Sequence, residues 1–389
     1  MMKMNRFLGG VLLVSGTTIG AGMLALPVMT ATAGFFPSLL LFFFCWLTML
    51  TSAFFFLDVN LAVRGEPNFI SMAGKMLGVW GKGVSWIVYL LLLYALLAAY
   101  IAGSTPLFID GIFALTGYVM PAWVAPFSLP LIFGSFIYLG TRGVDYINRL
   151  LMLCLGIGYV LLVMFVPQHI QSQYLLYHHW ASTLFALPVV ATAFGYHIII
   201  PSLTTYLDHN AKQLRWAIII GSVLPLIVYF IWQWLVLGTV PLTQLIAAFQ
   251  GGQSATEPLA QIINNPWIGL GARIFSFFAI VTSFLGISLS LSDFLTDGLK
   301  IKKSWEGKLL AYGLTFIPPL FFVFTYQRGF YLALQHGGAL VAILLIFLPA
   351  LMAWKLKSVR FYQSWKGRAL LVLIMLCALG IVVVDLLNV

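Results

Sequence analysis

Charged residues are scarce in this sequence. Only 8% of its 389 residues are Asp, Glu, Lys or Arg, whereas about 25% is usual in a soluble domain. Hydrophobic residues make up 62% of the chain, and they form one run after another of the length, about 20 residues, that a helix needs to cross a bilayer. The composition therefore excludes a soluble globular protein and indicates a helical membrane protein with many spans.

Three other features are scarce or missing. The three cysteines, Cys45, Cys154 and Cys377, lie in separate apolar runs and predict neither a disulfide framework nor a metal cluster. The sequence contains no G-x-x-x-x-G-K-[ST] loop for a nucleotide and no H-E-x-x-H cluster for hydrolysis. We therefore expect a protein that is not an enzyme, that needs no cofactor, and that draws any energy from ion gradients.

Eleven apolar segments predict eleven membrane-spanning helices. If the N-terminus is cytoplasmic, all of the 20 Lys and Arg except Arg273 and Arg328 fall on the inner side. Basic residues in short loops set this orientation, so the positive net charge follows from topology and requires no nucleic-acid partner. The predicted spans cover residues 8–33, 37–62, 84–110, 122–140, 149–167, 183–206, 214–238, 267–297, 308–326, 330–353 and 369–387.

The first span contains residues that a simple anchor does not need. Its segment "SGTTIGAGMLALP" holds Gly16, Gly20 and Gly22, although glycine costs about 1 kcal/mol relative to alanine inside a helix. The glycines could allow close helix packing. Alternatively the helix breaks there, and the freed backbone groups must line a cavity. Carbonyls near residues 16–18 would then attract an ammonium group or a cation, and amides at residues 20–23 would bind a carboxylate.

The sixth span is interrupted in a similar way. Its segment "ATAFGYHIIIPSL" meets Gly195 and then Pro201, and an odd number of spans separates it from the first, so the two cross in opposite directions. Paired broken helices of this kind are typical of transporters built from inverted repeats. We predict one membrane domain over residues 1–389, with repeats at about 8–167 and 183–353 and an extra helix at about 369–387. The two breaks together predict a site for a zwitterion, such as an amino acid.

Polar side chains near the breaks are candidates for ion coupling. His197 is ionisable at membrane depth, which is costly and often functional, and it suits proton exchange; a neutral histidine bonded to a freed carbonyl is the alternative. Thr282 and Ser283 could complete an oxygen-only cation site, although hydroxyls in helices usually bond to the preceding turn. Tyr94 and Gln233 are polar tips in the middle of other spans.

Several segments carry a resemblance to a known family. In order along the chain, "GTTIGAGMLALP", "YALLAAYIAG", "FGYHIIIPSL", "LRWAIIIGSVLPLIVYFIWQWLVLG" and "TSFLGISLSLSDFL" resemble the hydroxy and aromatic amino acid permeases, in particular bacterial tyrosine and tryptophan permeases. The resemblance implies an all-α, leucine-transporter-like fold of five plus five inverted helices, with helices 1 and 6 discontinuous. It also implies import of aromatic amino acids across the inner membrane, generally with protons. The span count and the distribution of Lys and Arg, apart from the resemblance, predict a periplasmic C-terminus.

The resemblance also implies which residues form the site. Substrate contacts are expected at Thr17, Thr18, Gly20, Ala21 and Gly22 in the first break and at Phe194, Gly195 and Tyr196 in the second. Apart from the resemblance, the mid-span polar tips Tyr94 and Gln233 are further candidates for substrate contact. Ion or proton coupling is expected from His197, Thr282 and Ser283. We therefore predict an alternating-access symporter for tyrosine, tryptophan or phenylalanine, whose partners are the small-molecule substrate and the lipid bilayer, with no obligatory protein partner. A carrier of small neutral amino acids and a sodium-coupled carrier are the alternatives. A channel would usually show repeated pore segments or rings of like charge.

Overall fold

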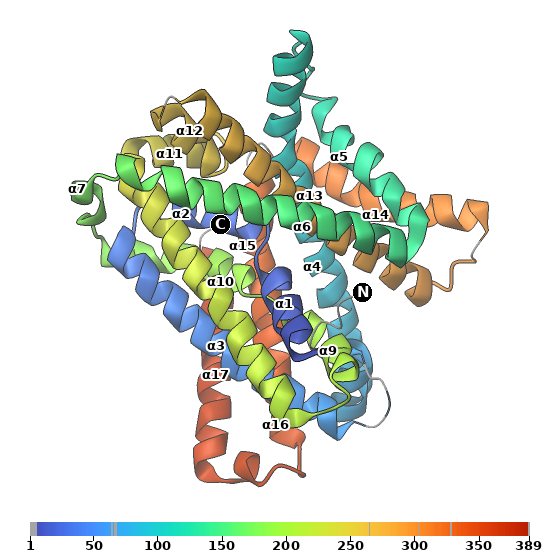
Figure 1. Ribbon diagram of the computed structural model, residues 1–389. Coiled ribbons are helices and arrows are strands. Elements are labelled where there is room, and N and C mark those ends of the chain that lie inside the picture. The colour runs from blue at the N-terminus through green and yellow to red at the C-terminus, as the bar shows by residue number, and fades with distance from the viewer. Residues whose placement is uncertain are drawn as a thin grey trace.

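The protein is a bundle of long helices (Figure 1). The computed structural model describes residues 6–63, 65, 68–263, 265–302, 304–326 and 329–387, and for 137–149 the backbone alone. Within this part of the chain, the β-structure is limited to a single bridge between Gly34 and His178. The all-helical class predicted from the composition is therefore confirmed.

Seven long helices form most of the bundle. Their sequences are apolar on nearly every face, as expected where a helix contacts either lipid or other helices. They are α3 (Phe35–Ala62), α4 (Phe69–Thr116), α6 (Gly140–Phe165), α10 (Ala211–Thr239), α13 (Pro266–Gly298), α14 (Trp305–Thr325) and α17 (Trp365–Leu387).

Three further spans are composed of shorter helices. The first joins α1 (Arg6–Thr18) to α2 (Gly22–Met29); the sixth joins η3 (Trp180–Ala186), α8 (Leu187–Ala193), η4 (His197–Ile199) and α9 (Ile200–Tyr206); the tenth joins α15 (Gly329–Val341), η5 (Ala342–Phe347) and α16 (Leu348–Lys355). In the described residues, nine helical segments are long and apolar enough to cross a membrane, or ten if the bent α1–α2 pair counts as one span.

The predicted spans at 122–140 and 84–110 differ from the structure in length. The first is a nine-residue helix, α5 (Ala125–Phe133), followed by a 3-10 turn, η1 (Gly134–Leu139), so the count of eleven spans stays a prediction. The second belongs to α4, which begins much earlier and kinks at Gly78, where a φ of 79° suits glycine.

Short helices cover the ends of the bundle between the spans. They are η2 (Pro167–His169), α7 (Ser172–Leu175), α11 (Leu242–Gln250), α12 (Thr256–Ile263) and η6 (Arg360–Gln363). The segment with α11 and α12 is attached to the first span, because the Ala255 N–H donates to the Leu24 carbonyl at 3.1 Å. The broken span is therefore held by a peripheral segment as well as by its neighbours in the bundle.

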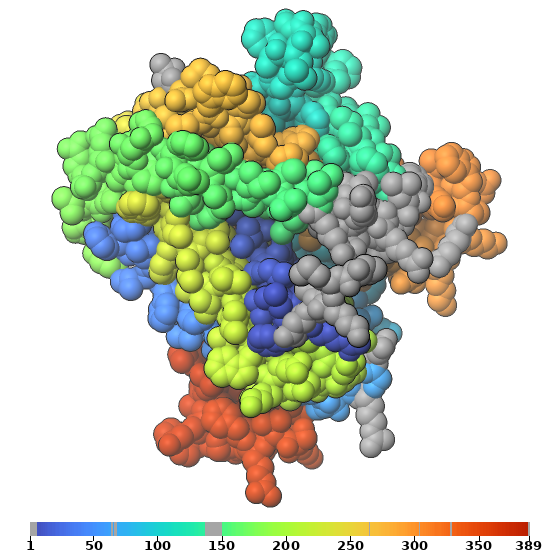
Figure 2. Space-filling model, in the orientation of Figure 1, coloured from blue at the N-terminus to red at the C-terminus, as the bar shows by residue number. Residues whose placement is uncertain are grey.

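The breaks of the first and sixth spans lie inside the bundle. α1 packs along α10, and α2 packs against α8; in Figure 1, α10 runs beside α1 near the centre of the view. Figure 2 shows side chains of α6 and α10 around α1, which reaches this face of the molecule. The breaks are consequently supported by long, unbroken helices.

Ion pairs join several helix ends. Arg6 pairs with Asp208, and Arg215 lies 2.8 Å from Asp58, which also accepts a hydrogen bond of 2.5 Å from the Tyr362 hydroxyl. Burial, together with the hydrogen bond to the Asp58 carboxylate, raises the pKa of Tyr362. This network ties α3, α10 and η6 together.

Two basic residues, Arg273 and Arg328, do not fall on the predicted inner side. Arg273 approaches Asp110 at 3.9 Å, whereas Arg328 lies outside the described residues.

Candidate functional site

The first helix breaks at the predicted glycines. α1 ends at Thr18 and α2 begins at Gly22, and the two helices are bent by 51°. Short turns replace the helical pattern, because the Met23 N–H donates to the Gly20 carbonyl and the Leu24 N–H to the Ala21 carbonyl, both at 3.1 Å. The freed ends of the two half-helices therefore lie within the span.

A side chain from α13 holds this break. The Ala21 N–H donates to the Ser283 hydroxyl oxygen at 3.0 Å. Gly20 lies against the same oxygen, and a Cβ atom at Gly20 would overlap it. A side chain at residue 20 would therefore displace the Ser283 hydroxyl from its position beside the Ala21 N–H.

The second break separates α8 from η4. The chain turns tightly after Ala193, because the Gly195 N–H donates to the Thr192 carbonyl at 3.0 Å and the Tyr196 N–H to the Phe194 carbonyl at 3.1 Å. Helical structure resumes at His197, and Pro201 lies in the first turn of α9, where its missing N–H costs no hydrogen bond.

Tyr229, on α10, connects the two breaks. Its hydroxyl lies 2.7 Å from the Thr18 carbonyl oxygen and 3.0 Å from the Ala193 carbonyl oxygen. These are the carbonyls at the last residues of α1 and α8, the negative ends of the two half-helices. The structure thus brings together the carbonyls that end the two half-helices, and one of them, that of Thr18, belongs to the stretch 16–18 from which the sequence analysis expects binding of a cation or an ammonium group.

Trp232, one turn further along α10, binds the other half of the first break. Its indole N–H donates to the Met23 carbonyl at 3.0 Å, and the side chain is fully buried. Sequence reasoning missed Tyr229 and Trp232 because aromatic residues are common throughout this chain and usually pack against neighbours. Their spacing on one face of α10, next to Gln233, was the available signal.

The second break contains buried polar atoms without partners. The side chains of His197 and Tyr196 are fully buried. The two ring nitrogens of His197 and the Tyr196 hydroxyl nevertheless have no hydrogen-bond partner. The Met49 backbone and Ser222 approach them without reaching hydrogen-bond geometry. The two rings stack at 5.2 Å. Such unpaired groups cost about 1–3 kcal/mol each.

The hydroxyl groups at the predicted cation site have separate partners. Thr282 donates to the Phe278 carbonyl at 2.8 Å, and Thr18 to the Val14 carbonyl at 2.8 Å, both within their own helices. Thr17 is exposed and bonds the Leu13 carbonyl at 2.7 Å. Of the predicted pair, Ser283 reaches the break and Thr282 does not.

Tyr94 and Gln233 are held by other elements. The Tyr94 hydroxyl donates to the Leu314 carbonyl on α14 at 2.8 Å. The Gln233 amide donates to the Thr30 hydroxyl at 2.6 Å, beyond the end of α2, and its carbonyl oxygen has no partner. Their predicted contact with substrate stays a prediction.

The site is closed in this conformation and is lined by backbone groups and aromatic rings. Ala21, Phe194, Tyr196 and Tyr229 are fully buried, and the Phe194 ring packs edge-on against Tyr229 at 5.1 Å. Gly22 lies next to Ala193, so the two breaks are in contact. In the part of the chain that the structure describes, no three His, Cys, Asp or Glu side chains gather as metal ligands.

Comparisons with known proteins extend over nearly the whole chain. The model of the tryptophan/tyrosine permease family matches residues 3–385. The chain is 34% identical to "Tyrosine-specific transport system 1" of Haemophilus influenzae, over 98% of this chain and 96% of that protein. It is 30% identical to "Tryptophan-specific transport protein" of Shigella flexneri, over 98% and 95%.

A solved structure shares the fold. A mutant of the Eremococcus coleocola manganese transporter aligns with a TM-score of 0.61 at 13% identity, over 98% of this chain and 85% of that chain. At this level of identity the likeness concerns the arrangement of the helices alone.

Proposed function

The chain belongs to the tryptophan/tyrosine permease family, and we propose that it is a symporter that imports aromatic amino acids across the bacterial inner membrane. The members of this family compared above are transport proteins and not enzymes. We further propose a cytoplasmic N-terminus and a periplasmic C-terminus, in agreement with the distribution of Lys and Arg.

The convergence of the two breaks is the observation that supports this proposal. An amino acid presents an ammonium group and a carboxylate, which require carbonyl oxygens and N–H groups respectively. The Thr18 and Ala193 carbonyls meet at one point, and the N-terminal end of α2 lies beside α8. Helix ends supply both kinds of partner without charged side chains.

The rings around the breaks support an aromatic substrate. Phe194, Tyr196 and Tyr229 are buried beside the backbone groups that would bind the ammonium group and the carboxylate, and ring pairs gain about 0.5–1.5 kcal/mol beyond their buried area. The first-break residues Gly20 to Gly22 would then hold the substrate backbone. Since the site is closed here, we propose that the repeats at 8–167 and 183–353 move against each other to open it, with 369–387 as an added helix.

We propose protons as the coupling ion, with His197 as the candidate at the second break. Its unpaired ring nitrogens are available to exchange a proton when the site opens. A sodium site at Thr282 and Ser283 is the alternative; in this conformation, however, Thr282 bonds its own helix and Ser283 accepts the Ala21 N–H.

Uptake into proteoliposomes tests the proposal. Radiolabelled tyrosine, tryptophan, phenylalanine and alanine are compared under imposed proton or sodium gradients. We expect the aromatic amino acids, but not alanine, to accumulate above equilibrium when the proton gradient is directed inward. The absence of gradient-driven uptake for every amino acid would contradict transport, accumulation of alanine would favour a small neutral substrate, and dependence on sodium alone would exclude proton coupling.

A further inference from the structure

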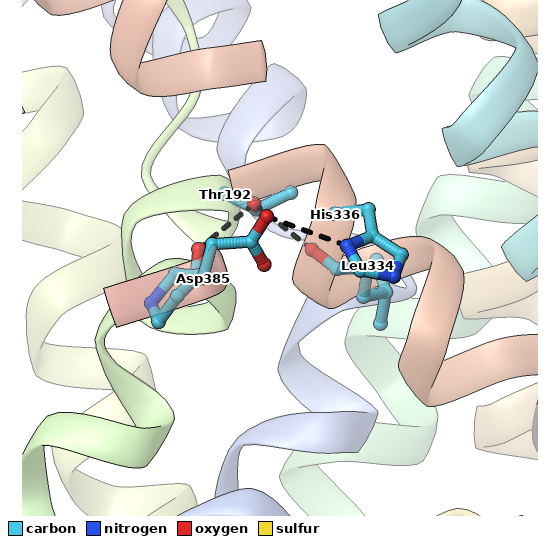
Figure 3. A network of polar contacts seen from close by, with 5 residues as sticks. Thr192, Leu334, His336 and Asp385 are labelled. Carbon is cyan, nitrogen blue, oxygen red and sulfur yellow. Dashed lines mark hydrogen bonds and ion pairs between the residues drawn. The ribbon is translucent and has the colours of Figure 1, made fainter. Parts of the chain in front are cut away.

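An ionisable pair lies between α15 and α17. His336 Nδ1 is 3.3 Å from Asp385 Oδ2 (Figure 3). The Asp385 side chain is 4% exposed and that of His336 is 43% exposed. The second carboxylate oxygen, Oδ1, is buried and has no hydrogen-bond partner. Ionisable side chains inside spans are costly and usually serve a function.

We propose that His336 and Asp385 form a proton-binding site that is loaded and emptied during each transport cycle. This inference rests on the proposed proton symport and places a protonation site outside the two breaks. With a neutral imidazole the pair carries a net charge of −1. One proton, taken up from the outer solution on the imidazole, converts it to an ion pair of net charge zero, and the same proton is later released to the inside.

Burial gives the two charge states different energies. A carboxylate removed from water is costly unless it is paired and hydrogen-bonded. When the ring is protonated, its Nδ1–H donates to Oδ2 and the charge of Asp385 is compensated. When the ring is neutral, that compensation is lost, so we expect α15 and α17 to shift relative to each other.

The position of the pair suits proton access. Asp385 lies two residues before the end of α17 at Leu387, which is the outer end in the proposed orientation. His336 is the partly exposed partner. In this proposal the driving proton binds the imidazole first, because the Asp385 carboxylate is buried behind it.

A hydrogen bond links α15 to the second break. The Thr192 hydroxyl lies 3.0 Å from the Pro188 carbonyl oxygen within α8 and 3.3 Å from the Leu334 carbonyl oxygen on α15 (Figure 3). Leu334 is two residues before His336, and Thr192 immediately precedes Ala193, the last residue of α8. The proton site and the break are thus connected through one shared hydroxyl.

Close packing reinforces this link. Gly338, two residues after His336, lies so near α8 that a Cβ atom there would overlap Pro188. The two backbones are therefore in direct contact, and a displacement of α15 cannot be absorbed by side chains. Because packed helices shift between discrete arrangements, a change at the pair is expected to reach the end of α8.

Other titratable groups on the surrounding elements have different neighbours. Among the described residues, the charge that acts on His336 is that of Asp385. Asp58 pairs with Arg215, and Asp110 approaches Arg273, whereas α8, η3 and η5 carry no titratable side chain. The remaining groups on the packed elements are Lys75, Lys82, Tyr89, Tyr94, Tyr100, Cys45, Tyr331, Lys355, Arg360, Tyr362, Lys366, Arg368 and Cys377.

Coupling measurements on Asp385→Asn and His336→Gln test the site. Proteoliposomes containing the full chain are assayed for tyrosine counterflow without gradients, for accumulation under an inward proton gradient, and for proton uptake reported by an enclosed pH-sensitive dye. We expect both variants to retain counterflow but to show lower accumulation and less proton uptake per tyrosine than the wild type, with His197 still present at the second break. A purely structural pair would lower all three readouts together.

Matched controls separate this site from others. Asp110→Asn removes a half-exposed carboxylate, and His209→Asn removes an exposed histidine whose φ of 58° asparagine tolerates; both should keep wild-type coupling. His336 is partly exposed, so His336→Gln keeps the test valid if Asp385→Asn expresses poorly. Wild-type proton uptake per tyrosine in both pair variants would overturn the proposal.

Measurements on the wild-type protein separate the proton site from the proposed transport function. If it exchanges tyrosine but takes up no proton, the result contradicts the proposed proton site and supports the proposed transport of amino acids. If it neither exchanges nor accumulates any amino acid, the proposed function itself is wrong.

Discussion

The two breaks differ in how their polar groups are satisfied. At the first, Ala21 bonds Ser283, and Trp232 bonds the Met23 carbonyl. At the second, the turn is closed by its own backbone, while the Tyr196 hydroxyl and both ring nitrogens of His197 are buried without partners. Side chains of α10 and α13 thus support the first break. At the second, Tyr229 on α10 bonds the Ala193 carbonyl, but three buried polar atoms have no hydrogen-bond partner.

This difference indicates different roles in transport. Partners on long, unbroken helices fix the geometry of the first break, which suits binding of the substrate backbone. Buried polar groups without partners are rare in stable structures, so the second break should rearrange or gain a ligand more readily. We expect the second break to rearrange during transport and the first break to bind the substrate backbone.

Substitution of Gly20 should have the largest effect on this comparison. In Gly20→Ala the added methyl group overlaps Ser283 and disturbs the best-supported contact of the first break. Overpacking costs about 1–3 kcal/mol, and each 1.4 kcal/mol is a factor of ten, so we expect tyrosine uptake to fall roughly 10- to 100-fold. Gly286→Ala, on α13 in open space, is the control. Normal uptake by Gly20→Ala would show that the close approach is not needed.

Removal of the hydroxyl that joins the two breaks should come next. Tyr229→Phe leaves the Thr18 and Ala193 carbonyls without their shared donor. An unsatisfied buried group costs about 1–3 kcal/mol, and we expect roughly tenfold lower uptake with a lower melting temperature. Tyr312→Phe removes a hydroxyl that bonds the Pro130 carbonyl at 2.8 Å on α5 and should transport normally. Equal effects in the two variants would contradict a special role for Tyr229.

The neighbouring Thr282 and Ser283 offer an internal control. Ser283→Ala removes the acceptor of the Ala21 N–H, and we expect a threefold to tenfold loss of uptake, since a hydrogen bond contributes about 0.5–1.5 kcal/mol. Thr282→Ala removes a bond within α13 and should change uptake less than twofold under a proton gradient. If uptake depends on sodium and Thr282→Ala abolishes that dependence, the oxygen site exists and this ranking is wrong.

The smallest expected effect concerns the segment that covers the first break. Burial, with a smaller contribution from Asp110, raises the pKa of Glu257 on α12 to about 7. The folded state therefore favours the neutral carboxyl, and this stability is complete below about pH 4.5 and lost as the pH rises through 7.

Thermal unfolding in detergent measures this effect. Between about pH 5 and pH 8 the wild-type melting temperature should fall by roughly 2 °C from this group, and Glu257→Gln should remove that part of the decrease. The control Glu306→Gln, at an exposed position on α14, should leave the pH-dependent decrease in melting temperature unchanged. An unchanged pH dependence in Glu257→Gln would exclude Glu257 as its source.

The sequence predicts the breaks better than it predicts their partners. The breaks can be predicted from Gly20, Gly22 and Gly195, because glycine at membrane depth is unusual. The role of Tyr229 cannot be predicted, because a tyrosine in an apolar helix resembles a packing residue until tertiary structure places its hydroxyl against two carbonyls. In the same way, Thr282 and Ser283 are indistinguishable in sequence, and only their rotation about α13 separates them.

Lengths and pairings across the bundle are also beyond the sequence. The prediction for 122–140 follows hydropathy, whereas α5 ends after nine residues and gives way to a 3-10 turn. Asp385 and His336 are 49 residues apart, so their contact depends on how α17 packs against α15. These features are set by helix packing, which leaves little trace in local sequence.

The Tyr229 hydroxyl lies within hydrogen-bond distance of two carbonyl oxygens but has a single hydrogen to donate. A phenol supplies one hydrogen, so at any instant only one of the Thr18 and Ala193 carbonyls receives it. An ammonium group supplies three, enough for both carbonyls and one further acceptor. At any instant one of the two carbonyls is therefore left to another donor, and we expect the ammonium group of an amino acid to complete the hydrogen bonds that Tyr229 begins.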